Sequence, residues 1–521
     1  MKTLKRRFVG AVLLALGAVF AAGAAWAATP KDVLVVGVSS DPSTLDPAVT
    51  IDNFDMREIF PVYDRLVQYK VVNGLGTTAV EPMAAESWFA SQDGLTWTFK
   101  LKPGITFSDQ TPLDADAVKY SIDRMMAIKM GPAGNFDSLD SVTVIDPLTV
   151  RFNLKHPFAP FLQVLATNGG SIVNPKTAKK AKGDDLAQGW LAQNMDGSGP
   201  YRLKEWLLGE RLVLEARPGY WGPAPALKQI IIRIMREPSD RRLALEKGDI
   251  DITESILVDQ LPQLEKNPAV RIGRYDGQFV EYVYLNNTRA PLNDKRVRQA
   301  LSYAVDYRGL IDHVLQGYGA QMRGPVPSGM WGHNPKAFQY KRDVAKAKEL
   351  LKEAGYGNGL TLTLIYSERR ATWEQIATLL QSNFAEIGVD LKLEMMANPA
   401  LRDRVANKNY ELCLGAWSPD FGDPYMFANL WFDSQYGGMP GNRSYYSNPE
   451  VDQKLRRAAE AGDADERLKL YTEVQDTVIE EAPYIYLYQL KAIVPMRKEV
   501  EGFVFNPLLE SMYNFATMRK R

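Results

Sequence analysis

The stretch from Leu360 to Met396 constrains the fold more than any other part of the sequence. It contains an apolar segment, "LTLTLIY", then "WEQIATLLQSNFAEIG", then a second alternating segment, "VDLKLEMM". In the middle segment the apolar residues recur at helical spacing and form one face, made of Trp373, Ile376, Ala377, Leu380, Phe384 and Ile387. A strand, an amphipathic helix and a second strand predict a crossover on a parallel sheet, so the fold class is α/β.

Other segments predict mixed sheets rather than purely parallel ones. "DVLVVGVSS", residues 32–40, predicts a buried strand that ends in a turn. "LTWTFKLKPGITF" and "VTVIDPLTVRFNL" alternate polar and apolar residues around Pro103-Gly104 and Asp146-Pro147, so each predicts a β-hairpin. Two helices are expected outside the crossover, from Asp114, whose carboxylate can cap the first turn, to Met125, and over residues 294–305.

The first 27 residues have the composition of a secretory signal peptide. Four positive charges precede an apolar run that finishes with small residues at Ala25 and Ala27, which predicts cleavage after Ala27. No later stretch approaches the roughly 20 uninterrupted apolar residues that a membrane span needs. The only cysteine, Cys413, is far from the cleavage site, so no lipid anchor is expected. We therefore expect a soluble protein of the periplasm.

Composition limits the partners and the source of stability. Without the leader the net charge is about −4 and no basic block is present, which argues against nucleic acid as the main partner. A single cysteine allows no internal disulfide, so stability must come from apolar burial, for which 45% hydrophobic residues suffice. Residues 28–521 are too many for one ordinary core and predict two or three domains.

A series of motifs in order along the chain resembles one family, the periplasmic solute-binding proteins of ABC importers. That family includes dipeptide-, oligopeptide- and nickel-binding members. The stretches that carry the resemblance are "VVGVSSDPSTLDPA", "VYDRLVQY", "PMAAESWFASQDGLTWTFKLKPGITFSDQTPLDADAVKYSIDR", "GSGPYRLKEW", "LEARPGYW", "EKGDIDI" and "VRQALSYAVDY". They cover nearly the whole chain after the leader, and they say more about the family than about the ligand.

The resemblance implies a two-lobe periplasmic-binding-protein fold with an extra subdomain inserted in lobe I. Applied to this chain, lobe I covers residues 28–281, with the insertion at about 71–185, and is completed by residues 489–521. Lobe II covers residues 282–488. "EYVYLNN" and "YIYLYQLKAIV" lie where the chain would cross between the lobes, although both also suit ordinary core strands.

The resemblance also implies a role for the stretch "WSPDFGDP". In peptide-binding members an aspartate at the position of Asp420 receives the free amino terminus of the ligand. Trp417, Phe421 and Tyr425 are then candidates to pack on the first ligand side chain, although each also suits a core position. Asp420 could instead bond its own backbone in a turn, and Asp423 is expected to be structural.

Other candidates follow from residue type and position. Ser39 and Ser40 come directly after the first predicted strand and are small enough for close backbone approach by an extended peptide, although an ordinary turn explains them nearly as well. Arg369 and Arg370 lie between a predicted strand and a predicted helix, where an arginine fork and a helix N-terminus can bind a carboxylate together. Both could equally be solvated surface charges.

Enzyme classes lack their motifs. Asp420-Phe421-Gly422 resembles a kinase metal-binding tripeptide, but no glycine-rich phosphate loop, "HRD" or "VAIK"-type segment accompanies it. There is no G-x-S-x-G and no H-E-x-x-H, so we expect neither catalysis nor a cofactor or metal.

The favoured function is a monomeric receptor that captures short peptides or similar amino-bearing solutes and delivers them to an inner-membrane ABC permease. The alternatives on the same scaffold are an oligosaccharide receptor, suggested by 10 Trp and 24 Tyr, and a nickel receptor, for which His333 is the one candidate ligand. A secreted hydrolase is the distant alternative.

Overall fold

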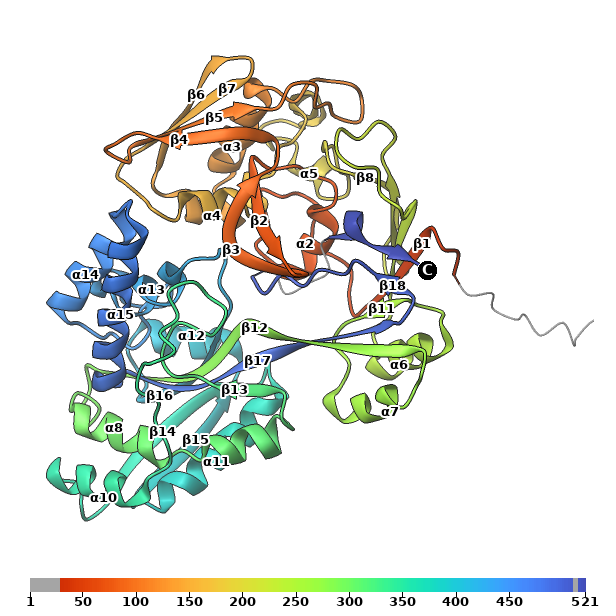
Figure 1. The fold of residues 1–521 in the computed structure, drawn as a ribbon. Coiled ribbons are helices and arrows are strands. Elements are labelled where there is room, and N and C mark those ends of the chain that lie inside the picture. The colour runs from red at the N-terminus through yellow and green to blue at the C-terminus, as the bar shows by residue number, and fades with distance from the viewer. Residues whose placement is uncertain (1–28, 509–513) are drawn as a thin grey trace, which may run out of the picture.

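The computed structural model describes residues 29–508 and 514–521, so the predicted leader, residues 1–27, lies outside the described residues. Figure 1 shows two lobes joined by a pair of long strands, β12 and β17, that run side by side from one lobe to the other. We call lobe I the part that holds strands β1 to β11 and lobe II the part that holds β14 to β16 with helices α8 to α15. None of the helices in the described residues is long and apolar enough to cross a membrane.

The main sheet continues through both lobes. Within the described residues it has eleven strands, and ten of them follow the order β15-β14-β16-β12-β17-β11-β1-β10-β9-β8 while β13 pairs with β17. The strands in that order are Val389–Met396, Leu360–Ser367, Leu412–Trp417, Val270–Leu285, Tyr484–Arg497, Ile252–Thr253, Val33–Val38, Gln229–Ile234, Arg211–Ala216, Tyr201–Leu207 and, for β13, Gly319–Gln321. Parallel pairs join β1 to β10 and β11 and join β14 to β15 and β16, so the sheet is mixed.

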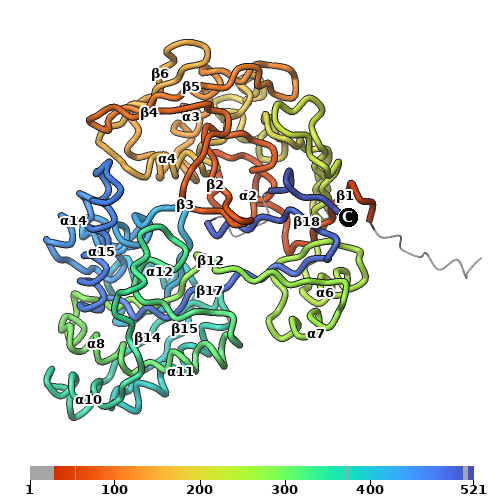
Figure 2. The backbone as a smooth tube through the Cα atoms, viewed as in Figure 1, coloured from red at the N-terminus to blue at the C-terminus, as the bar shows by residue number. Residues whose placement is uncertain are grey.

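A second, separate sheet lies between β1 and β8 in the sequence. Its order is β4-β5-β7-β6, with bounds Ala85–Ala90, Thr96–Leu101, Thr149–Leu154 and Leu139–Asp146. Helix α3 (Ala115–Ile128) packs on it, and the hairpin of β2 (Val67–Val72) and β3 (Leu75–Pro82) stands beside it (Figure 1). In Figure 2 this part, drawn in orange, forms its own body next to the rest of lobe I.

The remaining helices cover the sheets and their connections. In lobe I they are α2 (Asn53–Ile59), α4 (Phe161–Leu165), α5 (Gln188–Leu191), α6 (Pro238–Lys247) and α7 (Leu261–Glu265). In lobe II they are α8 (Lys295–Ala304), α9 (Tyr307–Gly309), α10 (Val344–Glu353), α11 (Ala371–Ala385), α12 (Asn398–Ala406), α13 (Asn429–Phe432), α14 (Pro449–Glu460) and α15 (Ala464–Glu481). The apolar face predicted for α11 is buried from Trp373 to Phe384.

Most of the predicted elements are confirmed. Strands β14 and β15 pair in parallel on either side of α11, as the crossover requires. Asp114 caps α3 by accepting a hydrogen bond from the backbone N–H of Ala117 at 3.0 Å, and Asp294 caps α8 in the same way. Strands β6 and β7 form the hairpin predicted around Asp146-Pro147.

The hairpin predicted at Pro103-Gly104 is wrong. Strand β5 ends at Leu101 and pairs with β4 on one side and β7 on the other, so neither of its edges is free. The residues after the turn form only an isolated bridge between Thr106 and Pro112. The alternation read from the sequence was real, but the partners of β5 were other strands.

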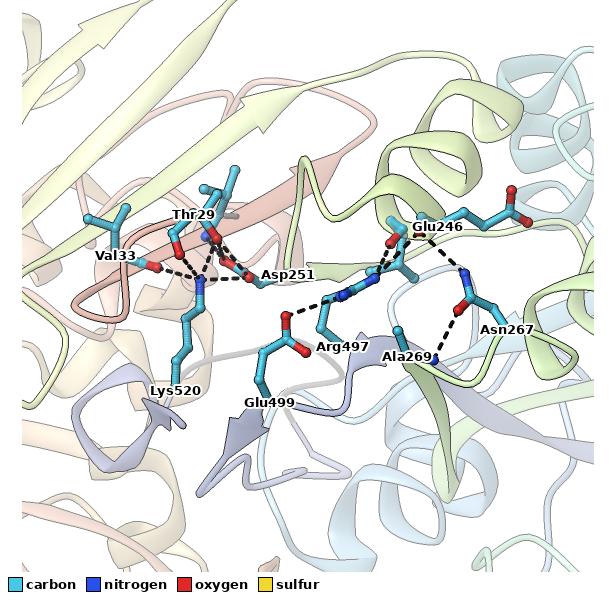
Figure 3. Close-up of polar contacts among 11 residues, drawn as sticks. Thr29, Val33, Glu246, Asp251, Asn267, Ala269, Arg497, Glu499 and Lys520 are labelled. Atoms are coloured by element: carbon cyan, nitrogen blue, oxygen red, sulfur yellow. Dashed lines mark hydrogen bonds and ion pairs between the residues drawn. The ribbon is translucent and has the colours of Figure 1, made fainter. Parts of the chain in front are cut away.

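The C-terminus closes lobe I by holding the first described residues in place (Figure 3). Lys520, 4% exposed at its side chain, lies 2.9 Å from the carboxylate of Asp251 and donates to the backbone carbonyls of Thr29 and Val33. The Asp251 carboxylate also accepts a hydrogen bond from the backbone N–H of Val35 in β1 at 2.8 Å. Three chain segments, residues 29–35, Asp251 and Lys520, therefore meet at one buried ion pair.

Removing this ammonium should destabilise the protein. Lys520→Met keeps most of the aliphatic side chain but leaves Asp251 buried without its cation, so the free energy of unfolding should fall by about 3 kcal/mol. Urea unfolding of the exported protein measures the change. Lys346→Ala is the control because Lys346 forms an exposed pair with Glu349, whose loss should change the stability very little. An equal loss of stability in the two variants would contradict the stabilising role assigned to the buried pair of Lys520 and Asp251.

Candidate functional site

A cavity of about 570 Å³ opens between the two lobes beside the connecting strands. This volume lies within the range of small-molecule sites. The lining residues come from three places: Ile51, Asp52, Phe54, Glu254, Ser255, Phe503 and Phe505 of lobe I; Arg369, Arg370 and Ser418 of lobe II; and Gly277, Phe279 and Leu490 to Val494 of β12 and β17. A ligand in this cavity would contact both lobes at once.

Three of the charged residues that line the cavity come shortly after strand ends, whereas Asp52 caps α2 and Lys491 lies within β17. Glu254 comes directly after β11, while Arg369 and Arg370 follow two residues behind the end of β14, and Ser418 follows β16. β11 is parallel to β1 and β14 is parallel to β16, so these are carboxyl ends of parallel strands, where open α/β sheets place their ligands. The wall from lobe I carries acids and the wall from lobe II carries arginines.

Arg369 and Arg370 both line the cavity but have different partners. The guanidinium of Arg370 lies 3.4 Å from Glu281 Oε1 and 4.3 Å from the centroid of the Phe279 ring. Among the described residues no ion pair involves Arg369, and its side chain is exposed. Both precede α11, where the backbone N–H groups of the first turn add a positive potential.

Glu281 holds Arg370 at the floor of the cavity. This carboxylate is 1% exposed, and besides Arg370 it accepts hydrogen bonds from Trp373 Nε1 at 3.0 Å and from the hydroxyl of Tyr488. Burial raises the pKa of Glu281, whereas Arg370 and the two hydrogen bonds oppose that rise. The network positions the guanidinium of Arg370, and its other N–H groups face the cavity wall.

Asp420 is a carboxylate without a cation. It follows β16 in lobe II. Burial raises the pKa of Asp420, Asn135 of lobe I lowers that pKa in part, and no ion pair within the described residues involves the carboxylate. The side chain is half-buried, and Asp420 itself does not line the 570 Å³ cavity, although Ser418, two residues before it, does.

Asp423, three residues further on, has the opposite environment. Its two carboxylate oxygens accept from Arg467 Nη2 at 2.8 and 2.9 Å, and one of them also accepts the backbone N–H of Tyr425. The residue is 1% exposed and holds the start of the short helix Pro424–Met426 against α15. Its contacts are those of a structural ion pair.

The aromatic candidates of this stretch pack against lobe I. The Phe421 ring is 6.4 Å from the Phe158 ring and 6.1 Å from the Tyr425 ring, and Phe158 meets Tyr425 at 5.3 Å. Phe421 is 2% exposed, and neither it nor Tyr425 lines the 570 Å³ cavity. Between them Gly422 donates its N–H to the Tyr69 hydroxyl at 2.9 Å, and an added Cβ would lie 2.6 Å from Leu508.

Trp417 and the serines lie apart from the cavity lining. The indole of Trp417 is half-buried, stands perpendicular to Trp431 at 6.3 Å, and its Nε1–H is buried without an acceptor. Ser39 and Ser40 follow β1 as predicted, but they are not among the residues that line the cavity.

Reasoning from the sequence missed Asp52 and Glu254, the acids of the lobe I wall. The strand β11 before Glu254 is only two residues long, so nothing in the alternation of the sequence marks it as a strand end. The signal that could have found it is the run "EKGDIDITES", in which an acid follows two apolar residues that pair beside β1.

The chain matches the family model described as bacterial extracellular solute-binding proteins, family 5 middle, over residues 79–439. It is 47% identical over 496 residues to the probable D,D-dipeptide-binding periplasmic protein DdpA of Escherichia coli K12, covering 95% of this chain and 96% of that protein. It is 30% identical over 526 residues to the glutathione-binding protein GsiB of Pectobacterium atrosepticum, covering 98% of each. The protein therefore belongs to family 5 of the bacterial extracellular solute-binding proteins.

Solved structures agree with this assignment. HbpA2 from Haemophilus parasuis superposes with a TM-score of 0.85 at 29% identity, covering 94% of this chain and 100% of that one. DppA from Helicobacter pylori, a periplasmic binding protein solved with the peptide STSA, superposes with a TM-score of 0.77 at 29% identity, covering 94% and 98%. The family is a solute-binding family rather than an enzyme family, and the fold is the two-lobe arrangement that the sequence predicts.

Burial raises the pKa of both carboxylates of the stretch, but Arg467 opposes the rise at Asp423 whereas no cation opposes it at Asp420, so amide substitution should change stability in opposite directions. The pKa of Asp420 in the folded protein is raised, so its ionisation opposes folding: the cost is absent below the ordinary aspartate pKa of about 4 and grows as the pH rises above it. Asp420→Asn should therefore make the empty protein more stable at pH 7 and leave it unchanged near pH 3.5. Thermal unfolding at both pH values measures this.

Asp423→Asn is the matched control because it removes a carboxylate of the same segment that does have a cation. It leaves Arg467 buried and unpaired, and the free energy of unfolding at pH 7 should fall by about 3 kcal/mol. If Asp420→Asn destabilised the protein at pH 7 as Asp423→Asn does, Asp420 would have a stabilising partner in the empty state.

Proposed function

We propose that this protein is a receptor for short peptides, dipeptides or longer oligopeptides, or for similar amino-bearing solutes, and that it delivers them to an inner-membrane ABC permease. The observation that carries the proposal is the unpaired Asp420. A carboxylate held at an interlobe surface without a cation is costly, and a ligand ammonium would remove that cost. Two charges about 4 Å apart at an effective dielectric near 20 attract by ~4 kcal/mol.

The other end of the ligand is assigned to the arginines. In this proposal Arg369 and Arg370 bind the ligand carboxylate at the N-terminus of α11. Arg369 is the more available of the two, since Arg370 already contacts Glu281. Trp417, Phe421 and Tyr425 shape the space around the first ligand residue, and Ser39 and Ser40 allow the backbone of an extended ligand to approach β1.

The relatives support a peptide ligand. One is a probable D,D-dipeptide-binding protein, a second, 29% identical over 475 residues, is the dipeptide-binding protein of Escherichia coli K12, and a third binds glutathione, itself a short peptide. An ammonium and a carboxylate at fixed spacing are common to these ligands. We therefore infer the same two groups for the ligand of this protein.

The proposal extends to export and domain organisation. The leader, residues 1–27, directs the chain to the periplasm and is cleaved, and the mature protein works as a monomer without catalysing a reaction. Lobe I comprises residues 28–281 and 489–521 with the insertion at about 71–185, and lobe II comprises residues 282–488. Binding closes the two lobes, because only the closed state lets both lobes contact the ligand.

Asp420→Ala tests the ammonium site. It should weaken the binding of Ala-Ala and tri-alanine by more than about tenfold, since truncating one partner of a buried charge pair costs at least 2 kcal/mol. Isothermal titration calorimetry measures the affinities, and the melting temperature of the empty variant should not fall. Unchanged peptide affinity would remove Asp420 from the site.

A wider ligand panel tests the receptor class itself. Thermal shifts with dipeptides, tripeptides, cello-oligosaccharides and Ni²⁺ should show stabilisation by peptides alone. A shift with the sugars or the metal, and none with peptides, would replace the peptide proposal by one of the other receptor types.

A further inference from the structure

Arg443 lies in a rigid loop of lobe II between α13 and α14. Its neighbours Asn442 and Ser444 are fully buried, and Asn442 donates to the carbonyl of Tyr446 at 2.7 Å while Ser444 donates to Asn442 Oδ1 at 3.0 Å. The carbonyl of Arg443 itself accepts a hydrogen bond from the hydroxyl of Tyr410. The backbone that presents this arginine is therefore fixed before any ligand binds.

The guanidinium of Arg443 has aromatic neighbours and no acid. It lies 5.1 Å from the centroid of the Trp417 ring, and the hydroxyls of Tyr282, Tyr284 and Tyr484 are near enough to act on it electrostatically. Its Nε donates to the carbonyl of Met439 at 3.2 Å. Within the described residues it forms no ion pair and no other side-chain hydrogen bond.

Two other largely buried arginines of this protein, Arg217 and Arg467, are satisfied. Arg217 donates from all three of its nitrogens to the carbonyls of Gly199, Thr106 and Ser198, at 2.7 to 2.9 Å. Arg467 pairs with Asp423. A guanidinium has five N–H donors, and one that is shielded from bulk water loses hydration unless acceptors replace it. Arg443 differs from these two arginines in having most of its donors unused, a feature that it shares with Arg65, whose Nη1 donates to the carbonyl of Tyr63.

The Trp417 side chain, which contacts the guanidinium of Arg443, carries a second unused hydrogen-bond donor. The Nε1–H of Trp417 is buried and has no acceptor, although indole N–H groups usually find one when buried. Trp417 is three residues from Asp420, the proposed ammonium site. A ligand with its amino group at Asp420 would therefore place its first residue near the Trp417 and Arg443 pair.

We propose that Arg443 and Trp417 form an anion-binding subsite that takes a carboxylate carried by the first residue of the ligand. This inference rests on the proposed function and adds to it a preference for ligands whose first residue carries a carboxylate. The planar fork of a guanidinium matches a carboxylate in a bidentate way, and the surrounding rings exclude the water that would weaken the pair. The carboxylate belongs either to an acidic side chain, as in Glu-Ala, or to the α-carbon of a γ-linked residue, as in γ-Glu-Ala.

Calorimetry with matched dipeptides tests the subsite in the unaltered protein. The panel is Ala-Ala, Gln-Ala, Glu-Ala and γ-Glu-Ala, in which Gln-Ala has the shape of Glu-Ala without its charge. One or both of the two acidic peptides should bind about 30-fold more tightly than Gln-Ala, as expected for a desolvated charge pair. The stronger of the two identifies the source of the carboxylate.

Two variants then assign the preference to Arg443. Arg443→Gln should remove the advantage of the acidic peptide over Gln-Ala while Ala-Ala binds with nearly unchanged affinity, and Arg443→Lys should restore part of it through its point charge. Arg369→Gln is the matched control: it should weaken all four peptides alike, because each has a C-terminal carboxylate.

The outcomes separate this inference from the function on which it rests. If Ala-Ala binds but neither acidic peptide exceeds Gln-Ala, the subsite is wrong and the peptide receptor stands. If an acidic preference survives in Arg443→Gln, another cation carries it and the assignment to Arg443 is wrong. If no peptide of the panel binds the unaltered protein, both proposals fall.

Discussion

The antiparallel ladder between β12 and β17 is the interaction on which the two-lobe structure depends. Residues 270–276 of β12 pair with 491–497 of β17 in lobe I, and residues 280–284 pair with 484–489 in lobe II. Between these runs the register shifts, and Gly277, where a Cβ would lie 2.9 Å from the carbonyl of Leu490, lines the cavity together with Phe279. Few ladder bonds join the two strands at this break, so a rotation of one lobe against the other about this point would disrupt few of them. The hinge expected for a two-lobe receptor therefore coincides with the floor of the cavity.

The polar groups around the break are organised rather than loose. Gln489 donates to the carbonyl of Gly277 at 3.1 Å, and Gln278, fully buried, donates to the carbonyl of Ser328 at 2.9 Å. Gln489 thereby satisfies the Gly277 carbonyl at the bulge, and Gln278 ties the bulge to the loop at Ser328. A hinge built in this way limits the direction of closure while its backbone remains free to bend.

Some charged side chains of this protein have an opposite charge as partner and others do not. Lys520 with Asp251 and Arg467 with Asp423 are buried pairs that hold segments together. Asp420 and Arg443 lack opposite charges among the described residues, and both lie in lobe II near the end of β16. Since a buried unpaired charge destabilises the empty protein, its persistence points to a partner that arrives from outside.

The sequence alone predicted elements whose signals are local. The apolar face of α11, the Asp114 cap and the hairpin at Asp146-Pro147 each depend on residues within about one helix or two strands. The local sequence pattern is therefore enough to predict them. The environment of Arg443 could not be read this way, because Tyr282 and Trp417 reach it from strands distant in the sequence. For the same reason the docking of Phe421 on Phe158 across the lobes was invisible.

The two walls of the cavity also limit the kind of ligand. Asp52 and Glu254 face it from lobe I, and Arg369 and Arg370 face it from lobe II, although Glu254 is partly neutralised by Arg57 at 2.7 Å. Opposite walls attract each other only weakly through water, because salt screens exposed charges beyond about 8 Å. A zwitterion that spans the gap replaces this weak attraction with two short contacts, whereas a ligand with charge of one sign meets a repelling wall. This distribution of charge, to which Lys491 of β17 adds a further cation, supports the proposed ligand with an amino group and a carboxylate, and in that proposal closure brings both walls to it.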